Sequence, residues 1–244
     1  MKMKIAGLML CCLLALQGYS QFTDSARHFI GYTGTGIVNS TETNRSHLFR
    51  NSLQAGMNRG NLSANGVFSW IYGRQNKLRT NNDYENAVDV DYRIDSSRVK
   101  VWVLGTYDKS FSLKINKRLQ AGSGLSYDIF RKNGNRLNVS DGILYESSDL
   151  ILADNTNDVY KTWRNSFRLK YIFHVGSLFE ITGTHFLQNS LSDKHDYNIR
   201  SQSGLAVKVI SWASITTAVT YNKINRLRRE NFLLTFGVNM RRYF

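Results

Sequence analysis

Five histidines are the side chains of this sequence that could serve as metal ligands or general bases. A zinc site or an activated nucleophile needs several groups that converge, such as a serine and a histidine held by a third orienting group. The histidines have no His-x-x-x-His spacing, and beyond His195-Asp196 they have no carboxylate cluster. They are His28, His47, His174, His185 and His195. The sequence therefore predicts no catalytic residue, no metal site and no cofactor site.

A lipid-modifying barrel enzyme is the catalytic alternative that remains open. Such a lipase or deacylase would use a serine and a histidine on neighbouring strands, and His174 and His185 lie on consecutive predicted strands. Two Gly-x-Gly segments, at residues 34–36 and 122–124, lack the lysine and the following helix of a phosphate-binding loop. We expect these glycines to let a curved sheet bend.

The elements that position these residues alternate with a period of two. Within residues 159–175, the apolar Trp163 and Phe167 share one parity, whereas the basic Arg164 and Arg168 share the other. Successive side chains of a strand point to opposite faces, so this alternation predicts strands with one apolar and one polar face. A helix would scatter the charges around its circumference, and we predict no helix after the signal peptide described below.

Segments of this kind follow one another to the carboxyl terminus. They span residues 29–42, 46–57, 60–74, 82–94, 98–109, 113–131, 136–149, 159–175, 177–189, 195–209, 211–223 and 229–244. Many exceed the length of about five or six residues that is usual for strands of soluble proteins. A tilted strand needs about nine to eleven residues to cross a membrane. The sequence predicts an all-β fold, a transmembrane antiparallel β-barrel of about twelve strands (about 10–14). The alternative is an exported soluble β-sandwich that acts as a binding module.

Most links between these strands alternate in length, although the links near residues 42–45 and 110–112 are short and would lie on the side of the long ones. Asn133-Gly134, the strongest hairpin signal of the set, belongs to the short links. The longer polar links are residues 75–81, 150–158, 190–194 and 224–228. Outer-membrane barrels have short periplasmic turns and longer extracellular loops. We therefore predict that the chain lies in the bacterial outer membrane, with the long links outside.

The beginning of the chain has the regions of a secretory signal peptide. Lys2 and Lys4 are basic, residues 5–16 are apolar, and the small Gly18 and Ser20 precede the predicted cleavage. The apolar run is too short to cross a bilayer as a helix. An uncut signal anchor is the alternative. The predicted organisation is a signal peptide over residues 1–20, a short N-terminal segment over 21–28 and the barrel over 29–244.

The chain is strongly basic, with 32 Lys and Arg against 18 Asp and Glu and a formal net charge of +14. An exported protein does not meet the chromosome, so lipid phosphates or surface polysaccharide are the expected anions and nucleic acid is not. Arginine forks match phosphate geometry, which predicts contacts with lipopolysaccharide from the outer loops. A generally solvated basic surface is the alternative. The outer-loop basic residues are Lys77, Arg79, Lys194, Arg226, Arg228 and Arg229.

The polar faces of two strands place charges of opposite sign in the predicted lumen. The acidic set is Glu85, Asp89 and Asp91, and the basic set is Arg164, Arg168 and Lys170. Like charges alone would repel in a narrow interior, so acidic and basic strands that face each other would satisfy one another. This predicts a salt-bridged, plugged interior, and the alternative is a narrow pore with a basic wall that favours anions.

The last strand carries a signal for assembly. Phe236 and Phe244 share the apolar parity of this strand, and Phe244 ends the chain. Outer-membrane barrels characteristically finish on such a strand with a terminal aromatic residue. We predict that the barrel-assembly machinery reads it.

The chain resembles the family of salt-induced outer-membrane proteins, barrels of unknown function. The resemblance rests on residues 60–70, 104–108 and 119–127 and covers most of residues 45–244. It implies an outer-membrane location and a barrel architecture, and it brings no catalytic residue. Together with this resemblance, the sequence predicts a structural function or that of a narrow pore, linked to envelope or salt stress. Outer-membrane lipid, lipopolysaccharide and the assembly machinery are the expected partners, and the sequence leaves the oligomeric state open.

Overall fold

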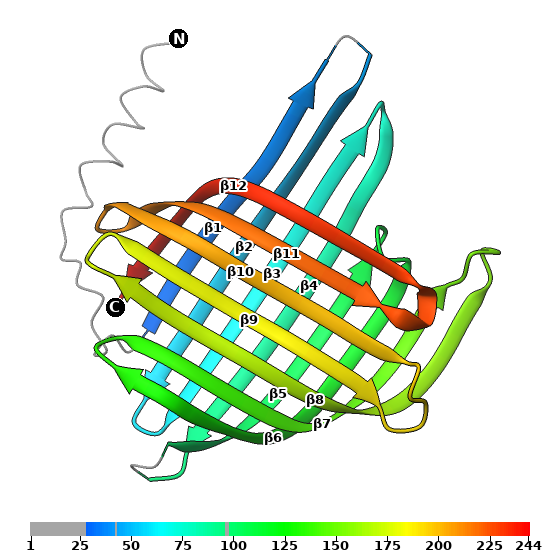
Figure 1. The fold of residues 1–244 in the computed structure, drawn as a ribbon. Helices are drawn as coiled ribbons and strands as arrows, with labels where there is room; N and C mark the ends of the chain where they lie inside the picture. Colours follow the sequence, from blue (N-terminus) through cyan, green and yellow to red (C-terminus); the bar gives the residue numbers. More distant parts are fainter. Residues whose placement is uncertain (1–27, 42, 96–97) are drawn as a thin grey trace.

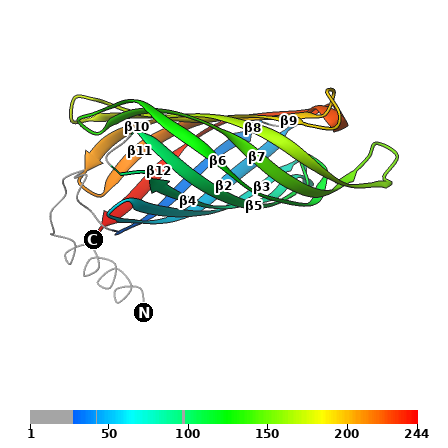
Figure 2. The same cartoon turned by 90° about the horizontal axis from the view of Figure 1, so that it is seen from below.

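The computed structural model describes residues 28–41, 43–95 and 98–244, whose strands form one closed antiparallel barrel (Figure 1). Neighbours in sequence are neighbours in the wall, and β1 pairs with β12 to close it. The strands tilt strongly about one long axis (Figure 2). A 3-10 helix, η1 (Asn225–Leu227), precedes the last strand. The strands of the described residues are β1 (His28–Ser40), β2 (Arg45–Arg59), β3 (Leu62–Gln75), β4 (Leu78–Arg93), β5 (Val99–Ser110), β6 (Ile115–Lys132), β7 (Asn135–Ile151), β8 (Asn157–Val175), β9 (Phe179–Ser190), β10 (Tyr197–Ile210), β11 (Ala213–Ile224) and β12 (Arg229–Tyr243).

The predicted fold class, an all-β antiparallel barrel of about twelve strands, is confirmed. Each predicted segment corresponds to one observed strand, and most bounds agree within two or three residues. Within the described residues, no helix has the length and apolar character needed to cross a bilayer. The predicted signal peptide and the segment after it lie outside the described residues, apart from His28, which begins β1.

The prediction of a long link over residues 75–81 is wrong. Asn76 and Lys77 form a two-residue turn with φ angles of 49° and 68°, and β4 begins directly after it at Leu78. Positive φ at both central residues is the geometry that matches the twist of a tight hairpin. The same geometry occurs at Asn133-Gly134, where the sequence signal is the stronger Asn-Gly pair.

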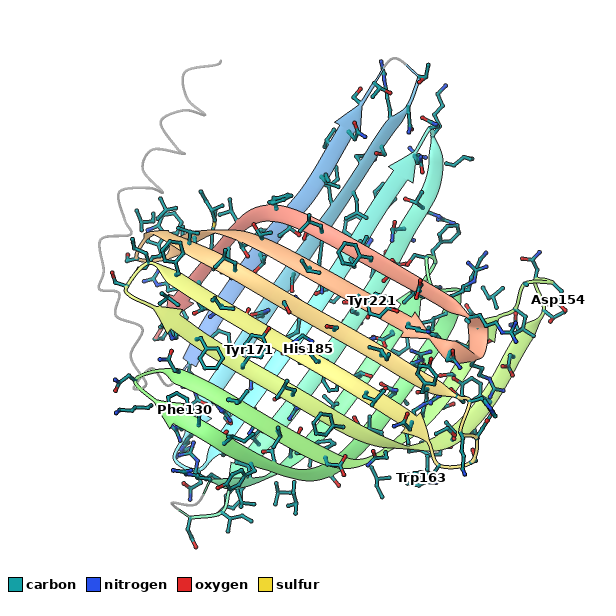
Figure 3. The ribbon with its side chains drawn as sticks, viewed as in Figure 1. Phe130, Asp154, Trp163, Tyr171, His185 and Tyr221 are labelled. Carbon is teal, nitrogen blue, oxygen red and sulfur yellow. The ribbon has the colours of Figure 1, made fainter. Side chains whose placement is uncertain are left out.

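The alternation predicted for the strands separates an apolar outer face from a polar inner face. On β8, Trp163 and Phe167 are exposed on the outside of the barrel, whereas Arg164 and Arg168 are buried inside it. Figure 3 shows where Trp163 and Tyr171 of this strand lie on the barrel wall. A bilayer surrounds such a barrel with apolar lipid chains, while the enclosed interior does not contact lipid. An apolar outer face and a polar inner face are therefore the arrangement of a membrane-spanning barrel.

The closure between β1 and β12 covers only part of both strands. Pairing runs from Phe29 opposite Tyr243 to Gly36 opposite Phe236. Beyond Gly36 the two strands diverge, and the β1–β2 hairpin, which stays paired with β3, projects beyond β12 beside the β3–β4 hairpin (Figure 1). The β12 residues 229–235 therefore pair with β11 alone.

The glycines of β6 and β7 make room for a tryptophan inside the barrel. Trp102 of β5 points inward and is buried, and its Nε1 donates a hydrogen bond to the carbonyl of Leu125 at 3.1 Å. A Cβ atom added to Gly124 or Gly142 would lie 2.7 or 2.4 Å from the Trp102 ring, and closer than 2.5 Å to a backbone oxygen of the neighbouring strand. These glycines thus admit a large side chain, which is a different role from the bending that the sequence suggests for Gly122 and Gly124.

We expect Gly142→Ala to destabilise the barrel by about 1–3 kcal/mol, because the added methyl group meets backbone that cannot move aside. The measurement is the free energy of unfolding in urea with the protein in lipid vesicles, followed by the heat-modifiable shift on gels. Gly105→Ala is the matched control, since its Cβ meets nothing within 4 Å. Equal stability of the two variants would contradict this account of the glycines.

Candidate functional site

The inner wall of the barrel holds the charges that the sequence placed on the polar faces of two strands. On β8, Arg164, Arg168 and Lys170 have the inward parity, and Arg164 is fully buried. On β4, Glu85, Asp89 and Asp91 share the parity of the buried Asn81 and Asp83. The candidate site is therefore the lumen itself.

The short contacts of these two sets are with other residues, and among the described residues no ion pair within 4.0 Å joins one set to the other. Glu85 instead binds Arg50 of β2, with an N–O distance of 3.1 Å. Arg168 donates from Nε to the hydroxyl of Ser140 at 3.0 Å. The sequence thus placed the charges on the inner wall without indicating the partners that they contact.

The most buried part of the site is an ion network around Arg164. Its Nε donates to Oε2 of Glu146 at 2.7 Å, and its Nη2 donates to Oδ1 of Asp196 at 2.9 Å. Glu146 also accepts hydrogen bonds from the Tyr160 hydroxyl and from Gln120, both at 2.6 Å. Arg164 and Glu146 are 0% exposed. A buried ion pair is stable only when hydrogen bonds satisfy its remaining groups, as they do here.

The network reaches the loops through Arg226 of η1. Arg226 donates from Nε and Nη2 to the two carboxylate oxygens of Asp158, at 2.6 and 3.1 Å, and its Nη1 lies 3.5 Å from Oδ2 of Asp196. Its guanidinium carbon stands 4.0 Å from the centre of the Tyr160 ring. The hydrogen bond with Asp158 raises the pKa of Arg226 above its ordinary value. We call this end of the barrel, with η1 and the loop before β10, the loop end.

Direct hydrogen bonds bridge the lumen between walls that are far apart in the strand order. Arg200 of β10 donates to Asp108 of β5 at 2.7 Å. Gln120 of β6 donates to Gln188 of β9 at 2.9 Å. At the loop end, Asn231 of β12 donates to Ser112 at 3.3 Å. Because side chains of these lengths meet directly, the opposite walls lie close together at these contacts.

Two apolar clusters occupy the lumen as well. One, at the loop end, combines Leu113, Ile115, Leu150 and Ile224 with the partly buried Tyr160 and Leu227. The other combines Trp102, Leu104 and Leu144 with Phe186 of β9, on the far side of the lumen. The guanidinium of Arg168 lies 5.5 Å from the Trp102 ring and 5.8 Å from the Phe186 ring. We call the second cluster, with Arg168, the central constriction.

The predicted outer-loop basic residues divide into several environments. Lys77 lies in the tight turn, and Arg79 lies within β4, where its guanidinium stacks 4.5 Å from the Phe111 ring. Arg226 is occupied by carboxylates, as described above. Lys194 lies in the exposed loop before β10, Arg228 has φ of 49° after η1, and Arg229 begins β12. The structure thus brings Arg228 and Arg229 beside η1, while Arg79 belongs to a strand rather than to a loop.

The two histidines considered for lipid chemistry have separate neighbours. His174 Nε2 lies 3.3 Å from Glu180, on the inner wall. His185 Nδ1 lies 2.6 Å from the hydroxyl of Ser201, and both point outward beside Tyr171, whose ring stacks on His185 with 5.6 Å between centres (Figure 3). Among the described residues, His185 has no further hydrogen-bond partner that would orient the ring. No group of three His, Cys, Asp or Glu side chains in the described part of the chain could hold a metal ion.

The terminal strand places its aromatic residues on the outer face. Phe236 and Phe244 are both exposed there, at 51% and 60%. The backbone of Phe244 exchanges two hydrogen bonds with His28, which joins the described chain ends at the end of the barrel opposite the loop end. We call this end the terminus end.

Sequence reasoning missed Glu146, Asp196, Asp108 and Arg200. Glu146 shares the inward parity of β7 with Leu144 and Leu150, so the inward face of this strand mixes charge with apolar residues and hides the alternation. The alternation of side chains along β7, counted from the Asn133-Gly134 turn, was the one signal in the sequence that could have been used. It would have placed Glu146 on the inner face, but it would not have identified Arg164 as its partner.

Comparison with known proteins identifies the family. The family described as "Protein of unknown function, DUF481" matches residues 36–239. The chain belongs to this family. The salt-induced character that the sequence resemblance implies stays a prediction. No curated protein matches the chain.

Solved structures similar to this member of the family are membrane barrels. The NanC porin is 13% identical, with a TM-score of 0.51, over 88% of this chain and 99% of that one. An outer membrane channel from Pseudomonas putida F1 is 9% identical, with a TM-score of 0.49, over 93% and 98%. The translocator domain of the autotransporter NalP from Neisseria meningitidis is 11% identical, with a TM-score of 0.47, over 96% and 95%. The likeness to the NanC porin shows a common fold, a membrane barrel.

We expect Arg164→Met to lower the free energy of unfolding by about 3–5 kcal/mol, because it leaves the buried Glu146 and Asp196 without their shared cation. Urea unfolding in lipid vesicles measures this change. The double variant Arg164→Met/Glu146→Gln is expected to recover part of the loss, since it also removes one of the two buried carboxylates that Arg164 neutralises, while Arg118, whose Nε lies 3.7 Å from Oε1 of Glu146, remains in place. Arg228→Met, outside the network, is the matched control. A loss no larger than that of the control would show that the network does not hold the lumen together.

Proposed function

We propose that this protein is an integral barrel of the bacterial outer membrane whose lumen is closed in its resting state and whose role in the envelope is structural. The observation that carries this proposal is the bridging of the lumen by direct side-chain contacts, above all Arg200 with Asp108 and Arg164 with Glu146. An open pore would leave such groups facing water. The outer-membrane barrels among the similar structures support the location.

The proposed partners follow from the two ends of the barrel. Arg228, Arg229 and Lys194 at the loop end would contact the phosphates of lipopolysaccharide, whereas Arg226 is already neutralised by Asp158 and Asp196. Phe244 would present the terminal aromatic residue to the assembly machinery. The resemblance to salt-induced barrels supports a role when the envelope is under salt stress.

We expect the purified protein in planar bilayers to give no conductance steps, and Trp102→Ala to introduce them. Removing this ring empties part of the central constriction, where Trp102 faces Phe186 across the lumen. Trp163→Ala is the matched control, because the same side chain is removed from the outer face of the barrel. The heat-modifiable gel shift verifies that each variant is folded.

Two results would contradict the closed lumen. One is conductance of the unmodified protein as large as that of Trp102→Ala. The other is an anion-selective current of the unmodified protein that Arg168→Glu reverses, which would establish the narrow pore with a basic wall instead.

We propose that the protein is not an enzyme. The pair of His185 and Ser201 has nucleophile and base within reach, but no third group of the described residues orients the imidazole. We expect His185→Ala and His174→Ala to leave the phospholipid and lipid A composition of the envelope unchanged, as measured by mass spectrometry. A lipid modification that is present with the unmodified protein and lost in both His185→Ala and Ser201→Ala would instead assign a lipid-modifying activity.

A further inference from the structure

The outer face of β7 carries a charge at a depth where the wall faces hydrocarbon. Asp141 has the outward parity of Ile143 and is exposed. Four residues nearer the loop end on the same face stands Tyr145, whose ring centre lies 5.2 Å from that of Trp163 on β8. Girdles of aromatic residues border the apolar band of outer-membrane barrels. With a rise of about 3.3 Å per residue and a tilt of about 40°, Asp141 lies about 10 Å inside this border.

A second pair of aromatic residues borders the band toward the terminus end. On β8, the outward Tyr171 follows Trp163 after eight residues (Figure 3), and its ring stacks on that of Phe173 with 5.8 Å between centres. The distance from Trp163 to Phe173 matches the length of about nine to eleven residues that a tilted strand needs to cross a membrane. Asp141 thus faces acyl chains, where a charged side chain is costly. The outward Lys161, by contrast, lies on the loop side of Trp163.

Asp141 has one hydrogen-bond partner within the described residues, and this partner is neutral. Nδ2 of Asn165, on the outer face of β8, donates to Oδ1 of Asp141 at 2.9 Å. Among the described residues, Oδ2 of Asp141 accepts no hydrogen bond, and the second amide hydrogen of Asn165 has no acceptor. Acyl chains can satisfy neither group. The pair therefore presents one free acceptor and one free donor to the bilayer.

A second copy of this chain carries the groups that this pair lacks. Barrels of one membrane share one orientation, so a twofold axis along the membrane normal brings the same depth of two outer walls together. At such an isologous interface the same surface of each copy meets itself. The free amide hydrogen of Asn165 in one copy then lies near the depth of the free carboxylate oxygen of Asp141 in the other, because the two side chains touch within each copy. The acyl chains of lipid offer no donor at this depth.

The surface around the pair suits close contact between two walls. Leu125 of β6 stands opposite Asp141, and Ile143 stands opposite Asn165, and both of these apolar side chains are exposed. The small Ser123 of β6, opposite Ile143, is exposed as well. Small residues let membrane segments approach closely. We call this surface the β7–β8 patch, and it consists of Ser123, Leu125, Asp141, Ile143, Asn165 and Phe167.

We propose that the β7–β8 patch is the contact surface of a homodimer, in which Asp141 and Asn165 of one copy pair with Asn165 and Asp141 of the other. Each carboxylate then accepts hydrogen bonds from two amides, and the apolar residues of the patch exchange contact with lipid for contact with protein. Hydrogen bonds between polar side chains of different segments stabilise association in membranes in this way. The homodimer adds an assembly to the structural role proposed above.

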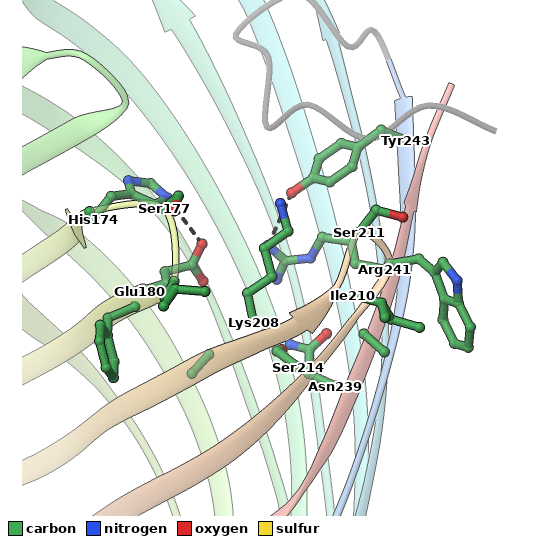
Figure 4. Close-up of a pocket in the computed structure, with 16 residues that line it drawn as sticks. His174, Ser177, Glu180, Lys208, Ile210, Ser211, Ser214, Asn239, Arg241 and Tyr243 are labelled. Carbon is green, nitrogen blue, oxygen red and sulfur yellow. Dashed lines mark hydrogen bonds and ion pairs between the residues drawn. The ribbon is translucent and has the colours of Figure 1, made fainter. Parts of the chain in front are cut away.

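The patch is separate from the interior of the barrel. A cavity of about 390 Å³ at the terminus end is lined by the end of β8 and by β9 to β12, with Glu180 and Asn239 among its lining residues (Figure 4). None of these lining residues belongs to the patch. Substitutions at Asp141 and Asn165 therefore change the outer face alone, and dimerisation can be measured without altering the lumen.

The test is sedimentation equilibrium of the full-length folded barrel in a detergent whose density matches that of the solvent. We expect the unmodified protein to reach the mass of two chains as its ratio to detergent rises. Asp141→Leu and Asn165→Leu are each expected to raise the dissociation constant about tenfold or more, since each removes hydrogen bonds from both halves of the symmetric contact. Both substitutions place an apolar side chain against lipid, and the heat-modifiable gel shift verifies that each variant is folded.

Asn86→Leu is the matched control, because Asn86 is an outward asparagine of β4 whose Nδ2 donates to the carbonyl of Tyr107 at 3.2 Å within its own wall. It is expected to dimerise as the unmodified protein does. An unmodified protein that stays monomeric at every concentration would assign the patch to another occupant and overturn the homodimer. A loss in Asn86→Leu equal to that in Asp141→Leu would overturn it as well.

Urea unfolding in lipid vesicles separates contact between copies from support within one wall. At a ratio of protein to lipid where the unmodified barrel is monomeric, Asp141→Leu is expected to unfold at the same or a higher urea concentration, because a charge leaves the lipid-facing surface. A lower midpoint would assign the pair of Asp141 and Asn165 to the stability of its own wall and overturn the homodimer. None of these results depends on whether the lumen conducts.

Discussion

The obligation to pair every backbone N–H and C=O group within a membrane is the constraint from which the rest of this structure follows. Closing the sheet on itself satisfies it, and closure divides each strand into an outer and an inner face. The outer face meets lipid and is apolar, as Trp163 and Phe167 are. The inner face must then accommodate the polar half of the alternation in a narrow space, where charges have little water to solvate them.

That second requirement explains the contents of the lumen. Arg164 serves two carboxylates, Glu146 and Asp196, and Arg226 shares Asp196 with Asp158. Each charge of this network is thus compensated by a neighbour from a different strand or loop, which holds these parts of the wall together. Apolar side chains such as Trp102 and Phe186 occupy another part of the lumen. The polarity of the barrel is therefore the reverse of that of a soluble protein, because its ion pairs lie in the interior and its outer face contacts hydrocarbon.

Strand positions and faces could be predicted because period two is a local property of the sequence. The turn at Asn76 and Lys77 could not, since neither residue is the glycine that usually marks positive φ. Glu146 and Arg164 are neighbours on adjacent strands, yet their pairing depends on the register and on the side-chain rotamers inside the lumen. Contacts such as Asp108 with Arg200 depend further on how closely the two walls approach, which no local pattern records.

The partial closure between β1 and β12 has a consequence for the motion of the barrel. From residue 229 to 235, one edge of β12 has no ladder partner in β1, so parting the wall there breaks fewer backbone hydrogen bonds than at any fully paired neighbouring strand. Amide protons along this edge will exchange with solvent or lipid-borne water sooner than those of β6 and β7. If the cylinder ever admits a molecule sideways from the bilayer, this slit is the route of least resistance.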